Sequence, residues 1–572
     1  MKSKKLNFLT ILLLALFVFP IFSFAQEIVD VPLDIGGDPF GVLNKFIMGD
    51  TTSTGERAHP DGIYRLQRGQ VYDCDLALLV NFNFSLIADD DDPANPVRPP
   101  MVIRGVKPDG TYNRYFFKFI EDGLNIKFKN ILFQGVRDDE LVEAKGPSAI
   151  RVEGTDHRIV IDNCVFNGFS GTALATRSSA SCSFILKNNI FRNAIALESP
   201  FGGSIYGSKL TRQDSVVMVN NTFFNQGGYI YLSIKGDLID YSEFSHNTIY
   251  KNTINGLWCP YLVNAKMTDN LIYNYQTVAQ SDFEIASGYF DKSGQPSCIA
   301  KLYPLDPALL ADWGKTEADR MVEYKNNVYA WSQDIKDYWD NGMDEAHNLP
   351  LIPVPWMNDS TKVLFGDKTA YPLLVDENNV ELDPGFDAAI NTTIMEKEMP
   401  FIKLFRKYGY GALVDPQERL FYSGPTKMFD IEWPLLENLS YTNTEALTHA
   451  EGGFPAGDLN WFPDKKAEWE DWLTGVKREE KESIPTEYTL SQNYPNPFNP
   501  STEINFSIPA SGNTSLAIYN VLGQKVATLV NKELTAGSYK YQFDASNLTS
   551  GIYFYKLQSN DYSQVRKMML LK

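Results

Sequence analysis

The chain has 572 residues, of which 44% are hydrophobic and 22% charged, a composition too apolar for a disordered chain and a length that suits two or more ordered domains. The formal net charge of −19 would repel a phosphate backbone, and no local basic patch offsets it, so the composition argues against nucleic acid as a partner. Aromatic residues reach 13%, which suits well-filled sheets and also offers platforms for sugars.

The first 25 residues have the pattern of a signal peptide. Lys2, Lys4 and Lys5 precede a long apolar run, and Ser23-Phe24-Ala25 forms a small-x-small cleavage site before Gln26. No cysteine follows that site, which argues against a lipoprotein anchor, and no other apolar run approaches the roughly 18 residues that span a bilayer. We therefore predict an exported mature chain without a transmembrane segment, with an uncleaved N-terminal anchor as the alternative.

The five cysteines are too few for a dense disulfide framework, and none is paired at CxxC spacing, so a structural zinc site has no support. We predict mostly buried thiols with at most one or two disulfides. The cysteines are Cys74, Cys164, Cys182, Cys259 and Cys298.

An internal repeat organises the region that follows. Six segments align on one asparagine, among them "IVIDNCVFN", "ILKNNIFRN" and "VMVNNTFFN". The residues three before and two after this asparagine are apolar in every segment, whereas the residue immediately before it is polar. Spacings of 26, 32, 26, 23 and 57 residues indicate stacked repeats. The aligned residues are Asn163, Asn189, Asn221, Asn247, Asn270 and Asn327.

Asparagine suits a tight corner between two strands, because it tolerates left-handed backbone angles and hydrogen-bonds locally. In stacked coils each asparagine can also bond its counterpart in the next layer, about 4.8 Å away. We therefore predict that the six asparagines form a ladder. The segment "FKNILF" adds an earlier rung with Ile131 at the corner.

This pattern resembles the right-handed parallel β-helix family, the pectate-lyase-like superfamily, over about Asp61 to Trp331. A leucine-rich horseshoe and a β-propeller are disfavoured, because their spacing and blade signatures are absent. The predicted fold class is all-β. The predicted organisation is a lead-in at 26–60 and a β-helix at 61–331, with an insertion at about 275–325 in which Asp306 and Thr316 cap short helices.

The repeat fades after Trp331, and residues 332–474 form an irregular region. A β-helix has open ends whose unpaired backbone groups must be covered, and we interpret this region as that cover. A separate sugar-binding module is the alternative. The region ends in a predicted helix that Asp464 caps, with Trp469 and Trp472 on one face. A charged linker follows at 475–487.

Residues 488–572 alternate apolar and polar positions over short strands, which predicts a small β-sandwich-like domain. Its segments "NYPNPFNPST", "VLGQKV" and "SGIYFYKL" resemble the type A C-terminal sorting domain of the type IX secretion system. The resemblance implies the secretion machinery as a partner, and a location outside the cell or on the outer-membrane surface of a Gram-negative bacterium. A fibronectin-like accessory domain is the alternative. The matching residues are Asn493, Pro495, Pro497, Phe498, Gly523, Gly551, Tyr553 and Lys572.

Residues able to carry chemistry are sparse. The resemblance to pectate lyases implies a lysine or arginine base that abstracts the proton alpha to a uronate carboxylate, often with Ca²⁺ held by carboxylates. A solvated surface position is the competing interpretation for Lys235, and a ladder position is the competing one for His246. The catalytic candidates are Lys235, Arg212 and Asp237, followed by Arg151, Arg158, His157 and His246.

The run Asp89, Asp90, Asp91 and Asp92 could bind calcium, but it lacks the alternating pattern of an EF-hand, and a solvated loop is the competing interpretation. No GxSxG, HExxH or P-loop motif is present. Two function classes stay open. One is a secreted polysaccharide lyase or glycoside hydrolase, and the other is a non-catalytic adhesin or structural surface protein. The deciding feature is a lysine or arginine beside two or more carboxylates on one strip of the outer surface, because fold alone does not settle function.

Overall fold

The computed structural model describes residues 27–38, 40–105, 114–135, 148–194, 203–207, 212–233, 238–291, 294–312, 314–408, 431, 433–474, 476–479, 485, 487–534, 536–545, 548–560 and 562–572. The predicted signal peptide and the candidates Lys235 and Asp237 lie outside these residues. The described chain forms two compact units, residues 27–462 and 463–572, and each is described by itself.

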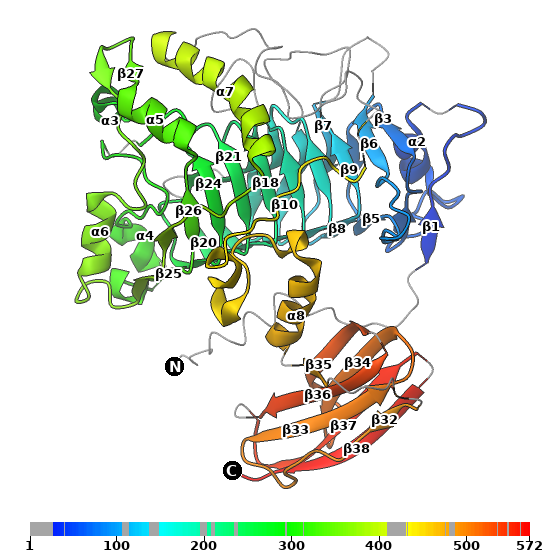
Figure 1. The fold of residues 1–572 in the computed structure, drawn as a ribbon. Helices are drawn as coiled ribbons and strands as arrows, with labels where there is room; N and C mark the ends of the chain where they lie inside the picture. The colour runs from blue at the N-terminus through cyan, green and yellow to red at the C-terminus, as the bar shows by residue number, and fades with distance from the viewer. Residues whose placement is uncertain are drawn as a thin grey trace. The chain divides into compact units, whose positions relative to one another are not determined.

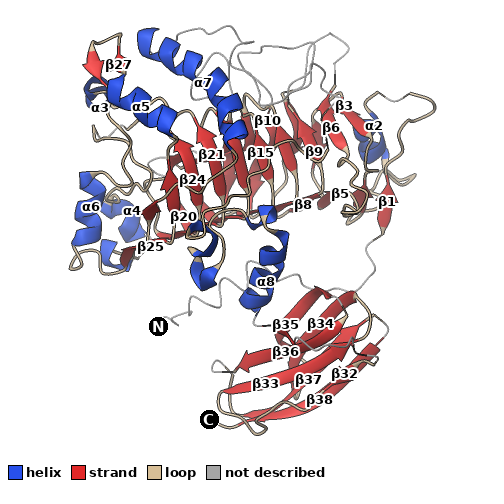
Figure 2. Cartoon of the chain, in the orientation of Figure 1, coloured by secondary structure: helices blue, strands red, loops and turns tan. Residues whose placement is uncertain are grey.

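The first unit is a stack of parallel coils (Figures 1 and 2). Each complete coil crosses three parallel sheets in turn, so that strands distant in sequence become neighbours along the stack. The first sheet contains β1 (Ile28–Asp30), β2 (Ile63–Arg65), β5 (Phe84–Ile87), β8 (Asn125–Lys129), β11 (Arg158–Asp162), β14 (Ser183–Lys187), β17 (Arg212–Val219), β20 (Leu238–Ser245), β23 (Asn264–Thr268), β25 (Met321–Lys325) and β29 (Leu374–Glu377).

The other two sheets complete the coils. The second sheet contains β3 (Val71–Cys74), β6 (Met101–Arg104), β9 (Leu132–Gln134), β12 (Val165–Asn167), β15 (Ile190–Arg192), β18 (Thr222–Gln226), β21 (Thr248–Asn252), β24 (Leu271–Tyr275), β26 (Val328–Ala330) and β30 (Val380–Glu381). The third sheet contains β4 (Leu78–Val80), β7 (Tyr115–Phe119), β10 (Ser148–Thr155), β13 (Thr172–Ala180), β16 (Ser204–Gly207), β19 (Tyr231–Leu232) and β22 (Leu257–Trp258).

The stack is longer than predicted at both ends. The lead-in contributes β1, and a further coil ends at Glu381 rather than at Trp331. The final coil was missed because helices separate it from the preceding one, which breaks the repeat. The helices are α2 (Val42–Gly49) at the N-terminal end, and α3 (Asp282–Ser287), α4 (Pro307–Asp312), α5 (Gln333–Asn341) and α6 (Asp359–Gly366) at the other end, where they gather beside β25 and β26 (Figure 1).

The predicted helix caps, Asp306 and Thr316, each lie directly before a short helix. Asp306 Oδ1 accepts from the Ala308 backbone N–H at 3.0 Å at the start of α4. Thr316 precedes the 3₁₀ turn Glu317–Asp319, and its backbone N–H donates to Asp319 Oδ2 at 2.9 Å. These short helices leave the stack between β24 and β25, which places an insertion in the region where the sequence predicts one.

The core of the stack contains a column of aromatic rings on the second sheet. Phe133, Phe166, Phe191 and Phe223 come from successive coils, and their ring centroids lie 4.7, 4.8 and 5.3 Å apart in nearly parallel planes. All four side chains are buried. Large apolar rings at every turn therefore supply both burial and ring stacking along the interior of the stack.

The corner between the first and second sheets is built from two adjacent residues. The first has a left-handed backbone with φ between 51 and 61° and is Asn188, Asn220, His246, Asp269, Asn326 or Asn378 in successive coils. The second is an inward asparagine. Asn221, for example, donates from Nδ2 to the Leu186 carbonyl at 3.0 Å and to Asn247 Oδ1 at 3.0 Å. Its Oδ1 accepts from the Asn189 backbone N–H at 3.0 Å, and the same pattern continues to Asn379.

The ladder corrects the predicted register at its first rung. Strand pairing places Asp162 opposite Lys187, so Asn163 aligns with Asn188 and not with Asn189. Asn163 has φ 52° and donates to Asn130 Oδ1 at 2.8 Å, outside the inward ladder. The inward position of this coil is held by Cys164, whose backbone N–H donates to Asn189 Oδ1 at 2.9 Å. The segment holds one asparagine at this corner, and aligning on it shifted the register by one residue.

All five cysteines are buried and free. Cys164 and Cys74 are fully buried, and this burial raises the pKa of the Cys164 thiol to about 12. The thiols therefore act as small apolar core groups, and a buried thiol with a raised pKa is a weak nucleophile.

The outer face of the second sheet is covered by residues 433–462, called here the covering segment. Its apolar side chains pack on those of β18, β21, β24 and β26. Arg192 on β15 forms a buried ion pair with Glu437, with Nε and Oε1 2.7 Å apart. Further along, Thr222 donates to Asp458 Oδ2 at 2.6 Å. The long helix α7 (Ala388–Tyr408) precedes this segment and also packs on the stack.

The second unit contains α8 (Pro463–Thr474) and two four-stranded antiparallel sheets. Helix α8, predicted as the end of the covering region, groups with this unit, where Asp471 pairs with Lys532 at 2.7 Å. It begins at Pro463, so Asp464 lies in its first turn. The strands are β31 (Val476–Glu479), β32 (Thr489–Leu490), β33 (Ser501–Ile508), β34 (Gly512–Asn520), β35 (Lys525–Leu534), β36 (Gly537–Asp544), β37 (Gly551–Ser559) and β38 (Tyr562–Leu570).

The proline-rich stretch is part of this second fold. Asn493 is buried and donates to Thr502 Oγ1 at 2.9 Å. Phe498 is buried, and its backbone N–H donates to the Met569 carbonyl at 3.0 Å. The stretch therefore fastens the last strand, β38, to the rest of the unit. Of the other matching residues, Gly523 has φ 75° in the turn between β34 and β35, Tyr553 donates to the Thr549 carbonyl at 2.8 Å, and the Lys572 backbone N–H donates to Ser550.

We expect Asn221→Ala to lower the free energy of unfolding by about 2–4 kcal/mol, because it leaves buried backbone groups without their partners. Chemical denaturation followed by circular dichroism measures this. The matched control is Asn125→Ala at an exposed position of β8, for which we expect less than about 0.5 kcal/mol. Equal losses in the two variants would contradict a stabilising ladder.

Removing the carboxylate with Glu437→Ala leaves the buried Arg192 charge uncompensated, so we expect a loss of about 3–5 kcal/mol and faster hydrogen exchange in the covering segment. The control is Lys336→Ala, which removes an exposed pair with Glu381 (40% and 47% exposed) and should cost about 1 kcal/mol at most. Unchanged exchange in the covering segment of the Glu437 variant would show that this ion pair does not hold it.

Candidate functional site

The covering segment occupies the outer face of the second sheet, and a group of charged side chains lies on the outer face of the first. On the first sheet, charged side chains from consecutive coils form one group. We call it the lysine–aspartate strip, and it consists of Lys127, Lys129, Asp162, Lys187 and Asp90.

Strand alternation places these lysines on the outside. On β8, Ile126 and Phe128 are buried in the core, so Lys127 and Lys129 between them point outward. Strand pairing then aligns Lys129 with Asp162 on β11, and Asp162 with Lys187 on β14. Three charged side chains from three coils therefore stand in one column, one rung apart.

Ion pairs connect the strip. Lys129 Nζ lies 2.7 Å from Asp90 Oδ1, and Lys187 Nζ lies 3.3 Å from Asp162 Oδ2. Asn188 Nδ2 donates to Asp162 Oδ1 at 2.9 Å, which fixes that carboxylate. The lysine side chains are about one third exposed, so a ligand in solution can reach them.

Lys127 has an unusual environment within the strip. Burial lowers the pKa of Lys127, and the neighbouring ammonium groups of Lys129 and Lys187 lower it further, against the opposing charges of Asp162 and Asp90. For Asp90, burial alone would raise the pKa, but the bonds from Lys129 and Asn130 bring it below the ordinary value. A lysine with a lowered pKa beside fixed charges is a candidate general base.

This arrangement meets the criterion set by the sequence, a lysine beside two carboxylates on one strip of the outer surface. It can do two things chemically. Its ammonium groups can attract and neutralise an anionic ligand, and the neutral form of Lys127 can accept a proton.

The acidic run considered as a calcium ligand lies beside protein cations. Asp89 lies 3.4 Å from Arg65, Asp90 pairs with Lys129, and Asp91 lies 3.1 Å from Arg68. Asp91 also accepts from the Val97 backbone N–H at 3.0 Å. Within the described part of the chain, no cluster of three or more His, Cys, Asp or Glu side chains could hold a metal ion.

Of the three leading catalytic candidates, Arg212 lies within the described residues. Arg212 on β17 forms a two-point ion pair with Asp240 on β20, at 3.0 and 2.9 Å, and this carboxylate raises the pKa of the Arg212 guanidinium. Lys235 and Asp237 lie outside the described residues. Arg158 is on β11, where burial lowers its pKa.

Arg151 lies elsewhere, on the third sheet. It donates to Tyr115 Oη at 2.7 Å and to Glu153 Oε1 at 2.6 Å, and Lys118 pairs with the same glutamate at 2.9 Å. Among the described residues the ion pairs of this cluster involve one carboxylate, Glu153, whereas those of the lysine–aspartate strip involve two.

Both candidate histidines are buried and bonded to backbone. His157 Nδ1 accepts from the Leu124 N–H at 3.2 Å, while its Nε2 lies 2.7 Å from the Glu153 carbonyl. His246 takes the left-handed corner position, and burial lowers its pKa, so the neutral form is favoured. Neither has the exposure that proton exchange with a substrate requires.

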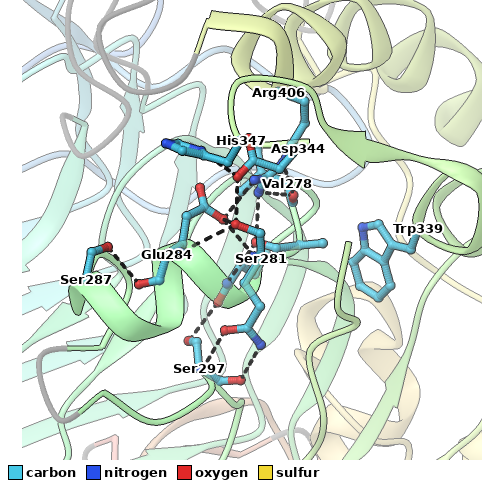
Figure 3. A network of polar contacts seen from close by, with 12 residues as sticks. Val278, Ser281, Glu284, Ser287, Ser297, Trp339, Asp344, His347 and Arg406 are labelled. Atoms are coloured by element: carbon cyan, nitrogen blue, oxygen red, sulfur yellow. Dashed lines mark hydrogen bonds and ion pairs between the residues drawn. The ribbon is translucent and has the colours of Figure 1, made fainter. Parts of the chain in front are cut away.

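A buried polar network lies near the end of the stack (Figure 3). Arg406 of α7 pairs with Glu284 of α3 at 2.8 Å and donates to the Val278 carbonyl. Ser281 Oγ donates to Asp344 Oδ2 at 2.7 Å, and His347 Nδ1 lies 2.9 Å from the same oxygen. The carboxylate stands between serine and histidine, so the histidine cannot take the serine proton directly. The network joins α7 to the stack and is not a nucleophilic site.

A cavity of about 740 Å³ opens between α4, α6 and the segment before α4. Tyr261 and Tyr303 line it with ring centroids 5.7 Å apart, together with Gln295 and Ser360. Aromatic faces beside amide and hydroxyl groups suit a sugar ring.

Sequence reasoning missed Lys127, Lys129 and Lys187. A signal for two of them was present, since Lys129 and Lys187 both stand two residues before the inward ladder position. The sequence alignment matched Asn163 with Asn189, one residue out of register. It therefore placed Asp162 in the column of Asn188 rather than in the column of Lys129 and Lys187.

Comparison with known families supports both units. A family model described as "Right handed beta helix region" matches residues 119–285, which include the coils of the lysine–aspartate strip. A model described as "Secretion system C-terminal sorting domain" matches residues 492–571. No curated protein and no solved structure matches the chain at a significant level.

In the described residues, no helix has both the length and the apolar character needed to cross a membrane. The two family matches agree with the two units of the structure, a stack of parallel coils and an antiparallel C-terminal fold. The chain is therefore a secreted right-handed parallel β-helix protein that ends in a C-terminal sorting domain of the type IX secretion system.

Proposed function

We propose that this protein acts on acidic polysaccharide outside the cell, as a lyase that uses the lysine–aspartate strip. The observation that carries the proposal is the geometry of the strip, in which Lys127 lies beside two further lysines and two carboxylates on adjacent coils, and burial and the neighbouring lysines lower its pKa. A uronate chain is anionic at every residue, so it is attracted to Lys129 and Lys187 despite the negative net charge of the protein.

The lysines suit an elimination reaction. An ammonium group has three donors, so Lys129 and Lys187 can keep their aspartate partners and still bind a uronate carboxylate. Neutralising that carboxylate acidifies the proton on the carbon next to it. Lys127 in its neutral form takes this proton, the bond to the leaving glycosidic oxygen breaks, and a carbon–carbon double bond forms.

The sorting domain gives the expected location of this activity. We propose that the type IX machinery recognises the C-terminal unit and delivers the β-helix to the outer surface of a Gram-negative cell or beyond it. A non-catalytic adhesin that uses the same strip is the second candidate, because lysines can bind a polyanion through ion pairs without catalysing a reaction.

We expect Lys127→Met to reduce formation of unsaturated product from polygalacturonate or alginate at least 100-fold, since a positioned general base typically contributes 10²–10⁴-fold. Ultraviolet absorbance of the product measures this on the full chain. The control is Lys325→Met, which removes a partly exposed lysine elsewhere on the first sheet and should keep full activity.

The outcomes separate the two functions. Equal activity in the two variants would refute Lys127 as the base. Absence of product from the unmodified protein, combined with polymer retention that Lys129→Met and Lys187→Met abolish, would establish the adhesin instead.

The rate of product formation should rise with pH as Lys127 loses its proton. Because the pKa of Lys127 is lowered, the midpoint of this rise should lie below the value of about 10.4 for an ordinary lysine. A profile that is flat across this range, or one that falls as pH rises, would contradict proton abstraction by Lys127.

Deleting residues 488–572 should keep the protein inside the cell envelope, because the machinery then lacks its recognition unit. Cell fractionation and immunoblotting measure the location, with Arg212→Met in the full chain as the control for normal export. Undiminished export of the truncated chain would contradict a sorting role for the C-terminal unit.

A further inference from the structure

A second polar column runs along the corner that follows the second sheet, and one of its members is a lysine. Strand pairing aligns Asn193, Asn225, Lys251 and Asn274 in successive coils, and all four have φ between 53 and 66°. Asn225 donates to Asn193 Oδ1 at 2.8 Å, as neighbouring ladder amides do. Lys251 replaces an amide in this column, so a primary amine lies against a carboxamide in the interior.

The Lys251 amine lies within hydrogen-bonding distance of a carboxamide and a carboxylate. Lys251 Nζ is 3.1 Å from Asn225 Oδ1 and 2.7 Å from Glu398 Oε2. All three side chains are at least 94% buried. The 3.1 Å contact with Oδ1 places the amine beside the Asn225 carboxamide, next to the Cγ that it would attack, in a site that excludes water.

Glu398 is held in place by other side chains. It comes from α7, far from Lys251 in sequence, and its Oε1 accepts from Thr253 Oγ1 at 2.9 Å and Thr277 Oγ1 at 3.0 Å. The second oxygen, Oε2, is thereby aimed at the amine. A buried pair of opposite charges is costly to desolvate, which favours transfer of the proton from the ammonium to the carboxylate.

We propose that Lys251 and Asn225 form an intramolecular isopeptide bond, with Glu398 as the proton carrier. Glu398 takes a proton from Lys251, and the neutral amine attacks Cγ of Asn225. An amide bond forms between Nζ and Cγ, and the bond between Cγ and Nδ2 breaks. Glu398 gives this proton to the departing nitrogen, which leaves as ammonia, and takes up the second proton of the Lys251 amine, so the new amide is neutral and no oxidant, reductant or other reactant is needed.

Other buried ion pairs of the β-helix lack one of these requirements. Lys301 pairs with Asp291 at 3.1 Å, but its amine donates to the Ser297 hydroxyl at 3.3 Å rather than to a carboxamide. Arg192 and Glu437 are equally buried, but a guanidinium stays protonated and is not a nucleophile. Lys251 combines a primary amine, a carboxylate and a carboxamide.

The bond would join two adjacent coils covalently at the point where α7 packs on the stack. It closes the loop from Asn225 to Lys251, which restricts the unfolded chain much as a disulfide does. The cross-link needs no oxidising compartment, since it forms without electron transfer. This inference stands independently of the polysaccharide proposal.

Peptide mapping of the purified full chain tests the proposal. Trypsin cannot cleave after an acylated lysine, so we expect a branched peptide. It joins the fragment that contains Asn225 to an uncleaved fragment that spans Lys251, with a mass one ammonia below the sum of its two parts. Fragmentation locates the branch. This localisation is needed because cyclisation of Gln26 or of Asn225 itself also releases ammonia, whereas neither blocks cleavage after Lys251.

Three variants complete the test. Lys251→Arg keeps a cation beside Glu398 but removes the primary amine. Glu398→Gln keeps the shape of the side chain but removes the carboxylate. We expect the branched peptide to be lost completely from both variants. Lys301→Arg, at the other buried lysine pair, should retain it. Complete tryptic cleavage after Lys251 in the folded, unmodified protein overturns the proposal even if the variants fail to fold. Persistence of the branch in Glu398→Gln would overturn the role of Glu398.

Discussion

The β-helix depends on the hydrogen bonds of asparagine amides buried at one corner of six successive coils. A left-handed residue turns the chain, and the following asparagine satisfies backbone groups of the same and neighbouring coils. A buried amide that loses these partners costs free energy, so each rung holds the next in one register. Because side chains alternate along a strand, a slip of one residue would turn every outward side chain inward. The ladder thus fixes which residues face the solvent as well as the shape of the coil.

The surface chemistry follows from that register. Lys127 and Lys129 are outward because Ile126 and Phe128 fill the core, and Asp162 and Lys187 stand beside them because the coils are stacked without offset. The covering segment then determines which outer faces a ligand can use. It packs on the second sheet with apolar side chains and the buried pair of Arg192 and Glu437. The first sheet therefore presents an uninterrupted column of charges across three coils.

Periodicity was enough to predict stacked coils, the insertion after β24 and the separate C-terminal unit, because each depends on patterns that repeat or change along the chain, and the family resemblance identified the stack as a parallel β-helix. Two features of the β-helix were missed because the repeat is interrupted there. Cys164 occupies the inward ladder position, so alignment on the nearby Asn163 shifted one rung. The last coil carries Asn378 and Asn379 but follows a helical excursion that hides its period. Burial of Glu398 against Lys251, some 147 positions apart in the sequence, had no local signal at all, because it depends on where α7 packs.

The lysine–aspartate strip attracts anions at short range, although the chain as a whole carries a net negative charge. A net charge of −19 repels an anionic polymer at long range, but charges in salt solution are screened beyond about 8–10 Å. Within that distance a uronate ligand on the first sheet is influenced mainly by Lys127, Lys129 and Lys187 and by two aspartates already engaged with the last two of these lysines. Binding at this face should therefore weaken as salt rises, because the attraction comes from the lysines. A ligand held mainly by the tyrosines of the 740 Å³ cavity would be nearly insensitive to salt. The salt dependence of binding thus reports which of the two surfaces a polysaccharide contacts.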